Sequence, residues 1–208
     1  MRLVLASASP RRKELLSQIG AQFDVCAVNI DETPLVDESP STYVSRMASE
    51  KALSCFKLHK LDDSLVILGS DTSVIIDNEI LGKPVDYLDS QKILRRLSGR
   101  THQVMTAVCI LIYRGDENAE EFDSSPDIFC KVVITNVQFK LISDAQIEAY
   151  WKSGEPQDKA GSYGIQGFGA AFVEHIQGSY SAVVGLPLAE VAEMLNIAGV
   201  PIWQIEKK

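Results

Sequence analysis

Apolar runs and capping residues predict that the N-terminal part of the chain alternates strand and helix. Residues 2–6 form a short apolar run typical of a buried strand. Ser9-Pro10 then supplies a helix-capping residue and a proline at the first helical position, which predicts a helix to about residue 19, ended by Gly20. A second strand is predicted over residues 22–28.

A long amphipathic helix and several further elements are predicted after this unit. Ser39-Pro40 repeats the cap-and-proline signal, and apolar residues at intervals of three and four continue the helix to about Leu58. The later elements are predicted at 65–68 (strand), 74–76 (strand), 88–97 (helix), 101–113 (strand), 128–141 (strand), 143–151 (helix), 170–176 (strand) and 188–197 (helix). Two long strands in direct succession predict an α/β fold with a mixed β-sheet flanked by helices.

Length and composition bound the organisation of the chain. It has 208 residues, of which 46% are hydrophobic and 23% charged, and it shows no repeat, linker or shift in composition. We therefore predict a single domain over residues 1–208 that needs no disulfide or structural metal to fold. The acidic, turn-rich segment 114–127 separates two predicted strands, and we expect a solvated hairpin or a disordered tip there.

Cysteine spacing and hydropathy indicate the compartment. Cys26, Cys55, Cys109 and Cys130 are widely spaced, with no C-x-x-C pair and no histidine in zinc-site spacing, so we expect reduced core thiols. No apolar run approaches the ~18 residues of a membrane span, and residues 1–7 are too short for the apolar region of a signal peptide. The expected location is the cytoplasm, with no membrane partner.

Charge narrows the class of ligand. The formal net charge of −8 excludes general attraction to nucleic acid, so a phosphate-bearing ligand requires a local group of cations. Arg11 and Arg12 are candidates, because the dipole of the predicted helix disfavours cations in its first turn by ~0.3–1 kcal/mol each. With Ser7, Ser9 and free backbone N–H groups they predict an anion site. The alternative is a pair of solvated arginines.

Four further charged residues depart from the local pattern. Lys51 falls on the apolar stripe of the 39–58 helix, where an ammonium needs an anion or a route to water. Asp71 lies beside a glycine between apolar runs, a position suited to a magnesium ion or to deprotonating a water, although a turn aspartate has the same pattern. Glu32 could share a cation with Asp71, and Lys83 is one more candidate cation.

Glycines are concentrated in residues 154–169, which hold five of the thirteen. Such a segment turns tightly or admits a ligand at close range, unless it is a plain mobile loop. It matches neither a Walker loop nor a dinucleotide-binding fingerprint. His59, His102 and His175 fall in no catalytic or metal-binding spacing, so we expect structural or surface roles for them.

Seven short motifs follow one another in an order that points to a known family. They are Ser7-Ala8-Ser9-Pro10-Arg11-Arg12, Asp31-Glu32, Glu50-Lys51-Ala52, Gly69-Ser70-Asp71-Thr72, Gly82-Lys83-Pro84, Ser98-Gly99-Arg100-Thr101-His102 and Ala160-Gly161-Ser162-Tyr163-Gly164-Ile165-Gln166-Gly167. Together they resemble the Maf family of nucleoside triphosphate pyrophosphatases, from residue 3 to about residue 190. Each motif alone is modestly specific, whereas seven in register are strongly so.

The resemblance implies a fold similar to that of the inosine triphosphatases, with two lobes around a cleft. It also implies a cytoplasmic homodimer that requires a divalent metal, Mg²⁺ or Mn²⁺, and cleaves a nucleoside triphosphate to monophosphate and pyrophosphate. By motif position, Asp71 resembles the catalytic proton acceptor, and Arg11, Glu32, Lys51 and Lys83 resemble the catalytic and phosphate-handling set. We hypothesise that Glu32 and Asp71 hold the metal.

Within the family, Gly164-Ile165-Gln166-Gly167 resembles the branch that acts on dTTP and UTP, in which positions matching Arg11, Thr72 and Gln166 govern substrate choice. An amide suits the N3–H donor and flanking carbonyls of uracil and thymine, whereas the branch acting on 7-methyl-GTP usually carries a glutamate. Two rival hypotheses stay open: a regulatory protein that senses nucleotides without turnover, and a nucleotidyltransferase.

Overall fold

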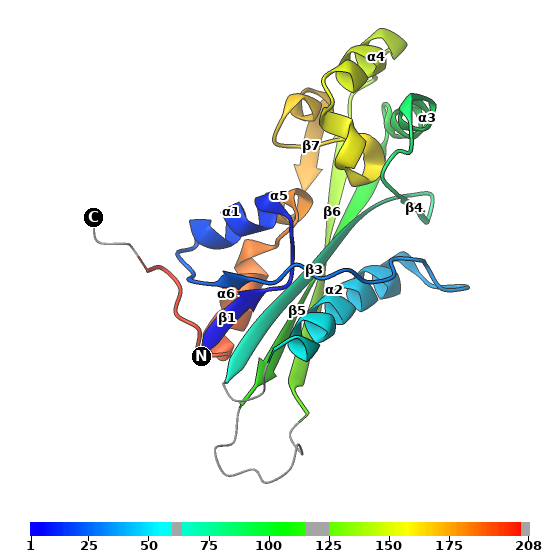
Figure 1. Cartoon of the computed structure of the whole chain (residues 1–208). Coiled ribbons are helices and arrows are strands. Elements are labelled where there is room, and N and C mark those ends of the chain that lie inside the picture. Colours follow the sequence, from blue (N-terminus) through cyan, green and yellow to red (C-terminus); the bar gives the residue numbers. More distant parts are fainter. Residues whose placement is uncertain (60–63, 115–124, 205–208) are drawn as a thin grey trace.

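The computed structural model describes residues 1–59, 64–114 and 125–204. Across these residues, seven strands form one mixed sheet in the order β2-β1-β3-β5-β6-β7, and β4 pairs with β3 outside this path (Figure 1). The strands are β1 (Arg2–Leu5), β2 (Asp24–Val25), β3 (Leu65–Ile76), β4 (Glu79–Leu81), β5 (Thr101–Tyr113), β6 (Asp127–Phe139) and β7 (Val173–Gln177). The helices are α1 (Pro10–Gln18), α2 (Pro40–Lys57), α3 (Tyr87–Leu97), α4 (Asp144–Lys152), α5 (Tyr180–Val184) and α6 (Leu188–Ile197), with short 3-10 helices η1 (Glu155–Asp158), η2 (Ala160–Ser162) and η3 (Phe168–Phe172).

Helices cover both faces of this sheet, as predicted. β1 runs parallel to β2 and β3, while β3, β5, β6 and β7 pair antiparallel. α2 packs on one face, where its buried side chains meet those of β1, β3 and β5. α1 and α6 pack on the other face within a second apolar cluster. In Figure 1, α3 and α4 lie far from α1 and α6 along β5 and β6, so the long strands join two groups of helices.

Local signals located most helices to within a residue. A proline begins α1 and α2, and Ser39 Oγ caps α2 by accepting a hydrogen bond from Thr42 N. Asp86 caps α3, and Ser143 with Gln146 forms the predicted capping box of α4. These predictions are confirmed. Each depends only on residues within one turn of the helix end, so the local sequence is enough to specify it.

The predicted break in the middle of β3 is wrong. Residues 69–72 continue the strand, and Asp71 pairs with Ala107 of β5. Gly69 explains the misleading signal, because a Cβ there would collide with the carbonyl oxygen of Ala48 where α2 crosses the strand. The glycine therefore permits close helix packing and does not make a turn. Asp71 lies inside a long strand and not at a strand end.

Other local predictions hold only in part. The strand predicted over 22–28 is confined to β2, and the strand predicted over 170–176 begins at Val173, after η3. The five residues of α5 are too short to give a periodic signal. Residues 115–124 of the predicted acidic tip lie outside the described residues. Among the helices described, none is long and apolar enough to cross a bilayer.

The expectation of four reduced core thiols is wrong for two of the cysteines. Cys109 and Cys130 are cross-strand partners in β5 and β6 and form a disulfide. Cys130 lies on an exposed part of β6, so it is not a core residue. Strand register, and not the separation of 21 residues, brings the two sulfurs together, and no local pattern specifies that register. Cys26 and Cys55 are free.

Candidate active site

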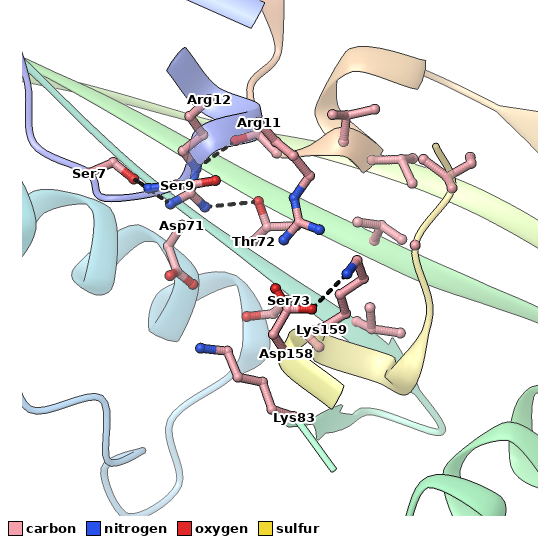
Figure 2. A pocket seen from close by; sticks show the side chains of 18 of the residues that line it. Ser7, Ser9, Arg11, Arg12, Asp71, Thr72, Ser73, Lys83, Asp158 and Lys159 are labelled. Atoms are coloured by element: carbon pink, nitrogen blue, oxygen red, sulfur yellow. Dashed lines mark hydrogen bonds and ion pairs between the residues drawn. The ribbon is translucent and has the colours of Figure 1, made fainter. Parts of the chain in front are cut away.

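A hollow of about 840 Å³ brings together residues that lie far apart in the sequence (Figure 2). Its walls come from the turn between β1 and α1, the middle of β3, the residues after β4, the glycine-rich segment and the end of α5. The residues predicted from the sequence all line it: Ser7, Ser9, Arg11, Arg12, Glu32, Lys51, Asp71, Thr72, Lys83 and Gln166. A hollow of this volume accommodates a small-molecule ligand.

Lys51 lies between two carboxylates in this hollow. Its Nζ is 2.8 Å from Asp71 Oδ1 and 2.8 Å from Glu32 Oε1. The side chains of Lys51 and Asp71 are each only 12% exposed, so α2 and β3 hold the pair largely away from water. The hydrogen bond from Lys51 lowers the pKa of Glu32 and outweighs the opposite effect of its partial burial. The protein itself therefore supplies the anions that Lys51 requires.

The segment that carries Glu32 is fastened to α2. Tyr43 OH donates to the main-chain oxygen of Glu32 at 2.9 Å. Arg46 Nη2 donates to Thr33 O at 3.1 Å. The same helix thus provides Lys51 and positions one of the two carboxylates that face it, which the sequence motifs alone did not indicate.

The two arginines of α1 make different contacts. Arg12 donates from Nε to Gly185 O (2.9 Å), from Nη1 to Ser7 Oγ (3.3 Å) and from Nη2 to Thr72 Oγ1 (3.3 Å). It therefore ties α1 to β3 and to the end of α5. For Arg11 we find no hydrogen bond or ion pair within the described part of the chain, and Figure 2 shows its guanidinium directed into the hollow. Arg11 is the arginine available to a ligand.

The start of α1 also keeps polar groups available. Ser9 occupies the predicted cap position, but its side chain makes no capping hydrogen bond. Its backbone N donates to Ser7 Oγ at 3.2 Å. Because both serines line the hollow, the positive end of the helix and a free hydroxyl face the same space.

Two more cations line the hollow from other elements. Lys83 follows β4 and Lys159 follows η1, and Figure 2 shows both side chains in the hollow. Lys159 Nζ donates to Asp158 Oδ1 at 2.6 Å and to Glu155 O at 2.8 Å. The sequence pattern does not single out Lys159, because an Asp-Lys pair is typical of a solvated surface. It is the cation that sequence reasoning missed.

Glu155 organises the glycine-rich segment. Its carboxylate accepts hydrogen bonds from Tyr150 OH (2.8 Å), Phe168 N (2.7 Å) and Gly169 N (3.1 Å). Tyr150 OH in turn accepts from Gly164 N at 3.0 Å. Burial raises the pKa of Glu155, but these hydrogen bonds together outweigh it and lower the pKa. One carboxylate and one phenol thus hold both ends of the loop 164–169.

This loop presents Gln166 to the hollow. Gln166 is exposed and lines the hollow, next to Gly167. A Cβ at Gly167 would collide with the Glu155 carboxylate, so the backbone wraps this group at a distance that only glycine permits. Gly161 N donates to Gly82 O at 3.0 Å, which connects the glycine-rich segment to the residue before Lys83. The glycines therefore permit close backbone approach.

The carboxylates of the hollow fit a divalent metal. Glu32 and Asp71 offer oxygen atoms, the ligands that Mg²⁺ and Mn²⁺ prefer. Both lie 2.8 Å from the Lys51 ammonium, so their oxygens face one region of the hollow. Proteins commonly hold Mg²⁺ with one or two carboxylates together with substrate phosphates.

The histidines have different surroundings. His102 is buried, its Nε2 lies 2.9 Å from Tyr163 OH, and burial lowers its pKa to about 4, which agrees with a structural role. His59 lies beside Cys26 and Cys55. Their separation along the chain gave no sign of this, since Cys26 approaches from a different element.

A mixed α/β fold that gathers cations and paired carboxylates around one hollow defines a protein that binds a small phosphorylated ligand. The family model described as "Maf-like protein" matches residues 2–198. The chain belongs to this family, so the resemblance carried by the seven motifs is confirmed.

Similar proteins match this chain over nearly all of its length. The dTTP/UTP pyrophosphatase of Shewanella sp. (strain MR-7) is 51% identical over 205 residues, which cover 96% of this chain and 100% of that protein. The dTTP/UTP pyrophosphatase of Pseudoalteromonas translucida (strain TAC 125) is 53% identical over 192 residues, which cover 92% and 94%. A solved nucleoside-triphosphatase / dITP/XTP pyrophosphatase from Mycobacterium abscessus is 14% identical, covers 66% of this chain and 74% of that one, and gives a TM-score of 0.36, too low to compare the folds in detail.

Proposed function

We propose that the protein hydrolyses dTTP and UTP to the nucleoside monophosphate and pyrophosphate. Membership of the Maf family and the names of relatives at 51% and 53% identity support this. The observation that carries the proposal is the position of Asp71. Its carboxylate shares one hollow with Arg11 and Lys83, so a proton acceptor and phosphate-binding cations face the same space.

The triphosphate lies over the N-terminus of α1 in this proposal. Arg11 and Lys83 neutralise its oxygens, and the backbone N–H groups at the helix start donate further hydrogen bonds. Ser7 and Ser9 line the same wall, which Arg12 holds in place. Because the net charge of the chain is −8, these few cations supply the local attraction.

Asp71 orients the attacking water and accepts its proton. The water oxygen attacks the α-phosphorus, and the bond from that phosphorus to the bridging oxygen breaks to release pyrophosphate. Lys51, 2.8 Å from Asp71 Oδ1, holds the carboxylate in position and contributes positive charge next to the phosphates.

We propose Glu32 and Asp71 as the residues that hold a divalent metal, Mg²⁺ or Mn²⁺. When bound, such an ion supplies a Lewis acid that neutralises phosphate charge. Removing divalent metal with a chelator should abolish hydrolysis, and adding Mg²⁺ back should restore it. Undiminished turnover in excess chelator would contradict the metal requirement.

Product analysis separates the proposal from its rivals. Incubation with UTP and Mg²⁺ should yield UMP and pyrophosphate. Bound but intact UTP would instead indicate the nucleotide-sensing regulatory protein. Little hydrolysis until an acceptor is added would indicate a nucleotidyltransferase, and UDP with orthophosphate would indicate another phosphatase chemistry.

The role of Asp71 is tested by Asp71→Asn. The amide cannot accept the water proton at neutral pH, so turnover should be abolished while nucleotide binding stays measurable by calorimetry. Asp144→Asn, which changes an exposed aspartate paired with Arg95, is the matched control and should retain activity. An active Asp71→Asn enzyme would refute the assignment.

Substrate choice is proposed to depend on Arg11, Thr72 and Gln166. Gln166→Glu replaces the amide donor by a second acceptor, which faces the uracil carbonyls unfavourably. We expect kcat/KM for UTP and dTTP to fall by about tenfold or more, since a mispaired polar group costs ~1–3 kcal/mol. A substrate panel with pyrophosphate detection, including modified pyrimidine nucleotides, measures this, and unchanged selectivity would contradict it.

We further propose that the protein acts in the cytoplasm as a homodimer. The homodimer is implied by the family resemblance alone. A light-scattering mass of the purified protein tests this, and a monomer at assay concentration would contradict it.

A further inference from the structure

Cys26, Cys55 and His59 form a second cluster of chemically active side chains. Cys55 is fully buried on α2, His59 follows the end of the same helix, and Cys26 follows β2. One ligand atom from each, a sulfur of each cysteine and a ring nitrogen of the histidine, lies within 4.8 Å of the other two. None of the three is among the described residues that line the hollow.

Hydrogen bonds hold the three residues in these positions. Cys26 N donates to Leu5 O at 3.0 Å, which fixes it beside β1. His59 N donates to Phe56 O at 3.0 Å, and His59 Nδ1 lies 2.8 Å from Cys55 O. The same Nδ1 lies 3.8 Å from Cys55 Sγ, so the imidazole is held against both the backbone and the thiol of Cys55.

The donor set suits a zinc ion. Two thiolates and one imidazole, with water in the fourth position, are an established tetrahedral arrangement for Zn²⁺. Bond lengths of about 2.3 Å to sulfur and 2.0 Å to nitrogen place tetrahedral ligand atoms roughly 3.5–3.8 Å apart. Small side-chain rotations would bring atoms that lie within 4.8 Å of one another to such spacings. The three residues offer no carboxylate, so a hard cation such as Mg²⁺ finds no suitable ligand there.

We propose that Cys26, Cys55 and His59 bind one Zn²⁺ ion, at a site separate from the hollow. Cys26 and His59 are half-buried, so an ion can approach them from the surface while Cys55 stays in the core. This proposal does not depend on the identity of the nucleotide or on catalysis.

The position of the cluster indicates what the ion does. Cys55 lies one helical turn after Lys51 on α2. Cys26 begins the segment that carries Val28 and Glu32, both of which line the hollow. An ion shared by Cys26 and Cys55 joins this segment to the helix that bears Lys51. It therefore stabilises the hollow from behind without touching the ligand.

Metal binding to the whole protein tests the proposal. The protein is stripped with a chelator, supplied with excess Mg²⁺ to occupy carboxylate sites, and dialysed against Zn²⁺. We expect one equivalent of zinc per chain and a higher melting temperature. Co²⁺ in place of Zn²⁺ should give an intense near-ultraviolet band from thiolate-to-metal charge transfer, which oxygen ligands do not produce.

Matched variants locate the ion. Cys26→Ser and His59→Gln, both at half-buried positions, should lose the zinc equivalent and the charge-transfer band while circular dichroism shows a folded chain. His175→Gln on β7 changes the same residue type elsewhere and should keep both signals. The proposal is overturned by less than one equivalent in the wild type, by unchanged zinc in both cluster variants, or by a metal-free disulfide between Cys26 and Cys55.

Discussion

Individual side chains in the hollow divide into those that hold its walls and those that face the ligand. Arg12 uses three of its five N–H donors on Gly185, Ser7 and Thr72. Arg11, the adjacent residue, points into the open space. Two arginines that are equivalent in the sequence motif are therefore expected to contribute to different measurable quantities, stability in one case and affinity in the other.

Truncating each arginine separates these contributions. Arg12→Ala removes three hydrogen bonds that tie α1 to β3 and to the end of α5, which should lower the free energy of unfolding by about 1–3 kcal/mol. Arg11→Ala should leave the melting temperature nearly unchanged but lower kcat/KM for UTP at least tenfold, because it removes a charged contact to phosphate. Thermal unfolding and steady-state kinetics on both variants measure this. Equal effects on stability would contradict the division.

Lys51 makes the free energy of unfolding depend on pH through its ion pair with Glu32. It lowers the pKa of Glu32 from its ordinary 4.5, so the pair stabilises the folded state fully above about pH 4.5. The contribution is lost as the pH falls through the lowered folded-state pKa. The difference in unfolding free energy between wild type and Lys51→Met should therefore be larger near pH ~7 than near pH ~3.

Denaturant unfolding at several pH values measures this difference. Lys152→Met is the control, since its ammonium pairs with Glu148 on the exposed surface of α4 and should contribute ~0–1 kcal/mol at any pH. A Lys51→Met effect that is constant across the pH range would show that Lys51 acts through packing alone.

At the scale of elements, the glycine-rich loop is held as a unit. Glu155 and Tyr150 receive the N–H groups of Gly164, Phe168 and Gly169, so the loop is fixed at both ends. The Glu155 carboxylate therefore fixes the position of the loop relative to η1. Gly167 allows the backbone to approach the Glu155 carboxylate closely. The glycines of this loop therefore have a packing role and do not form a nucleotide-binding fingerprint.

Glu155→Gln should loosen this loop. The amide keeps one acceptor oxygen but turns N–H groups toward backbone N–H donors, which costs about 1–3 kcal/mol. We expect a lower melting temperature and a higher KM for UTP, because Gln166 is carried by the loop. Glu148→Gln on exposed α4 is the matched control. Unchanged KM and melting temperature would show that the loop does not depend on Glu155.

At the scale of the whole molecule, β5 and β6 connect the two groups of helices. Their pairing runs from Thr101 with Gln138 to Ile112 with Asp127, and the disulfide between Cys109 and Cys130 lies within it. A cross-link that closes a loop of this length stabilises a folded chain by about 3 kcal/mol, mainly by restricting the unfolded state.

Cys130→Ser should therefore lower the free energy of unfolding by about 3 kcal/mol under non-reducing conditions. In a reductant the variant and the wild type should unfold alike, since the cross-link is then absent from both. Chemical denaturation with and without reductant measures the two differences. A gap that persists in reductant would mean that the substitution itself disturbs packing on β6.

Sequence reasoning succeeded where a feature depends on neighbours along the chain. The caps at Ser39 and Ser143 and the charges that conflict with their helix, such as Lys51, were all visible locally. It failed where strand register or helix crossing decides the outcome, as for Gly69 and for the Cys109–Cys130 pair. The ten candidate residues were placed together by family resemblance, because no local signal specifies that α1, α2 and β3 converge.

The hydrogen bond from Arg12 Nε to Gly185 O joins atoms whose residues are 173 positions apart. A protein emerging from the ribosome makes Arg12 long before Gly185, and it cannot close this wall in between. Half-synthesised copies, and fragments cut by proteases before this position, should accordingly be inert toward free nucleotides. The ability to bind nucleotide therefore requires that Gly185 has been synthesised.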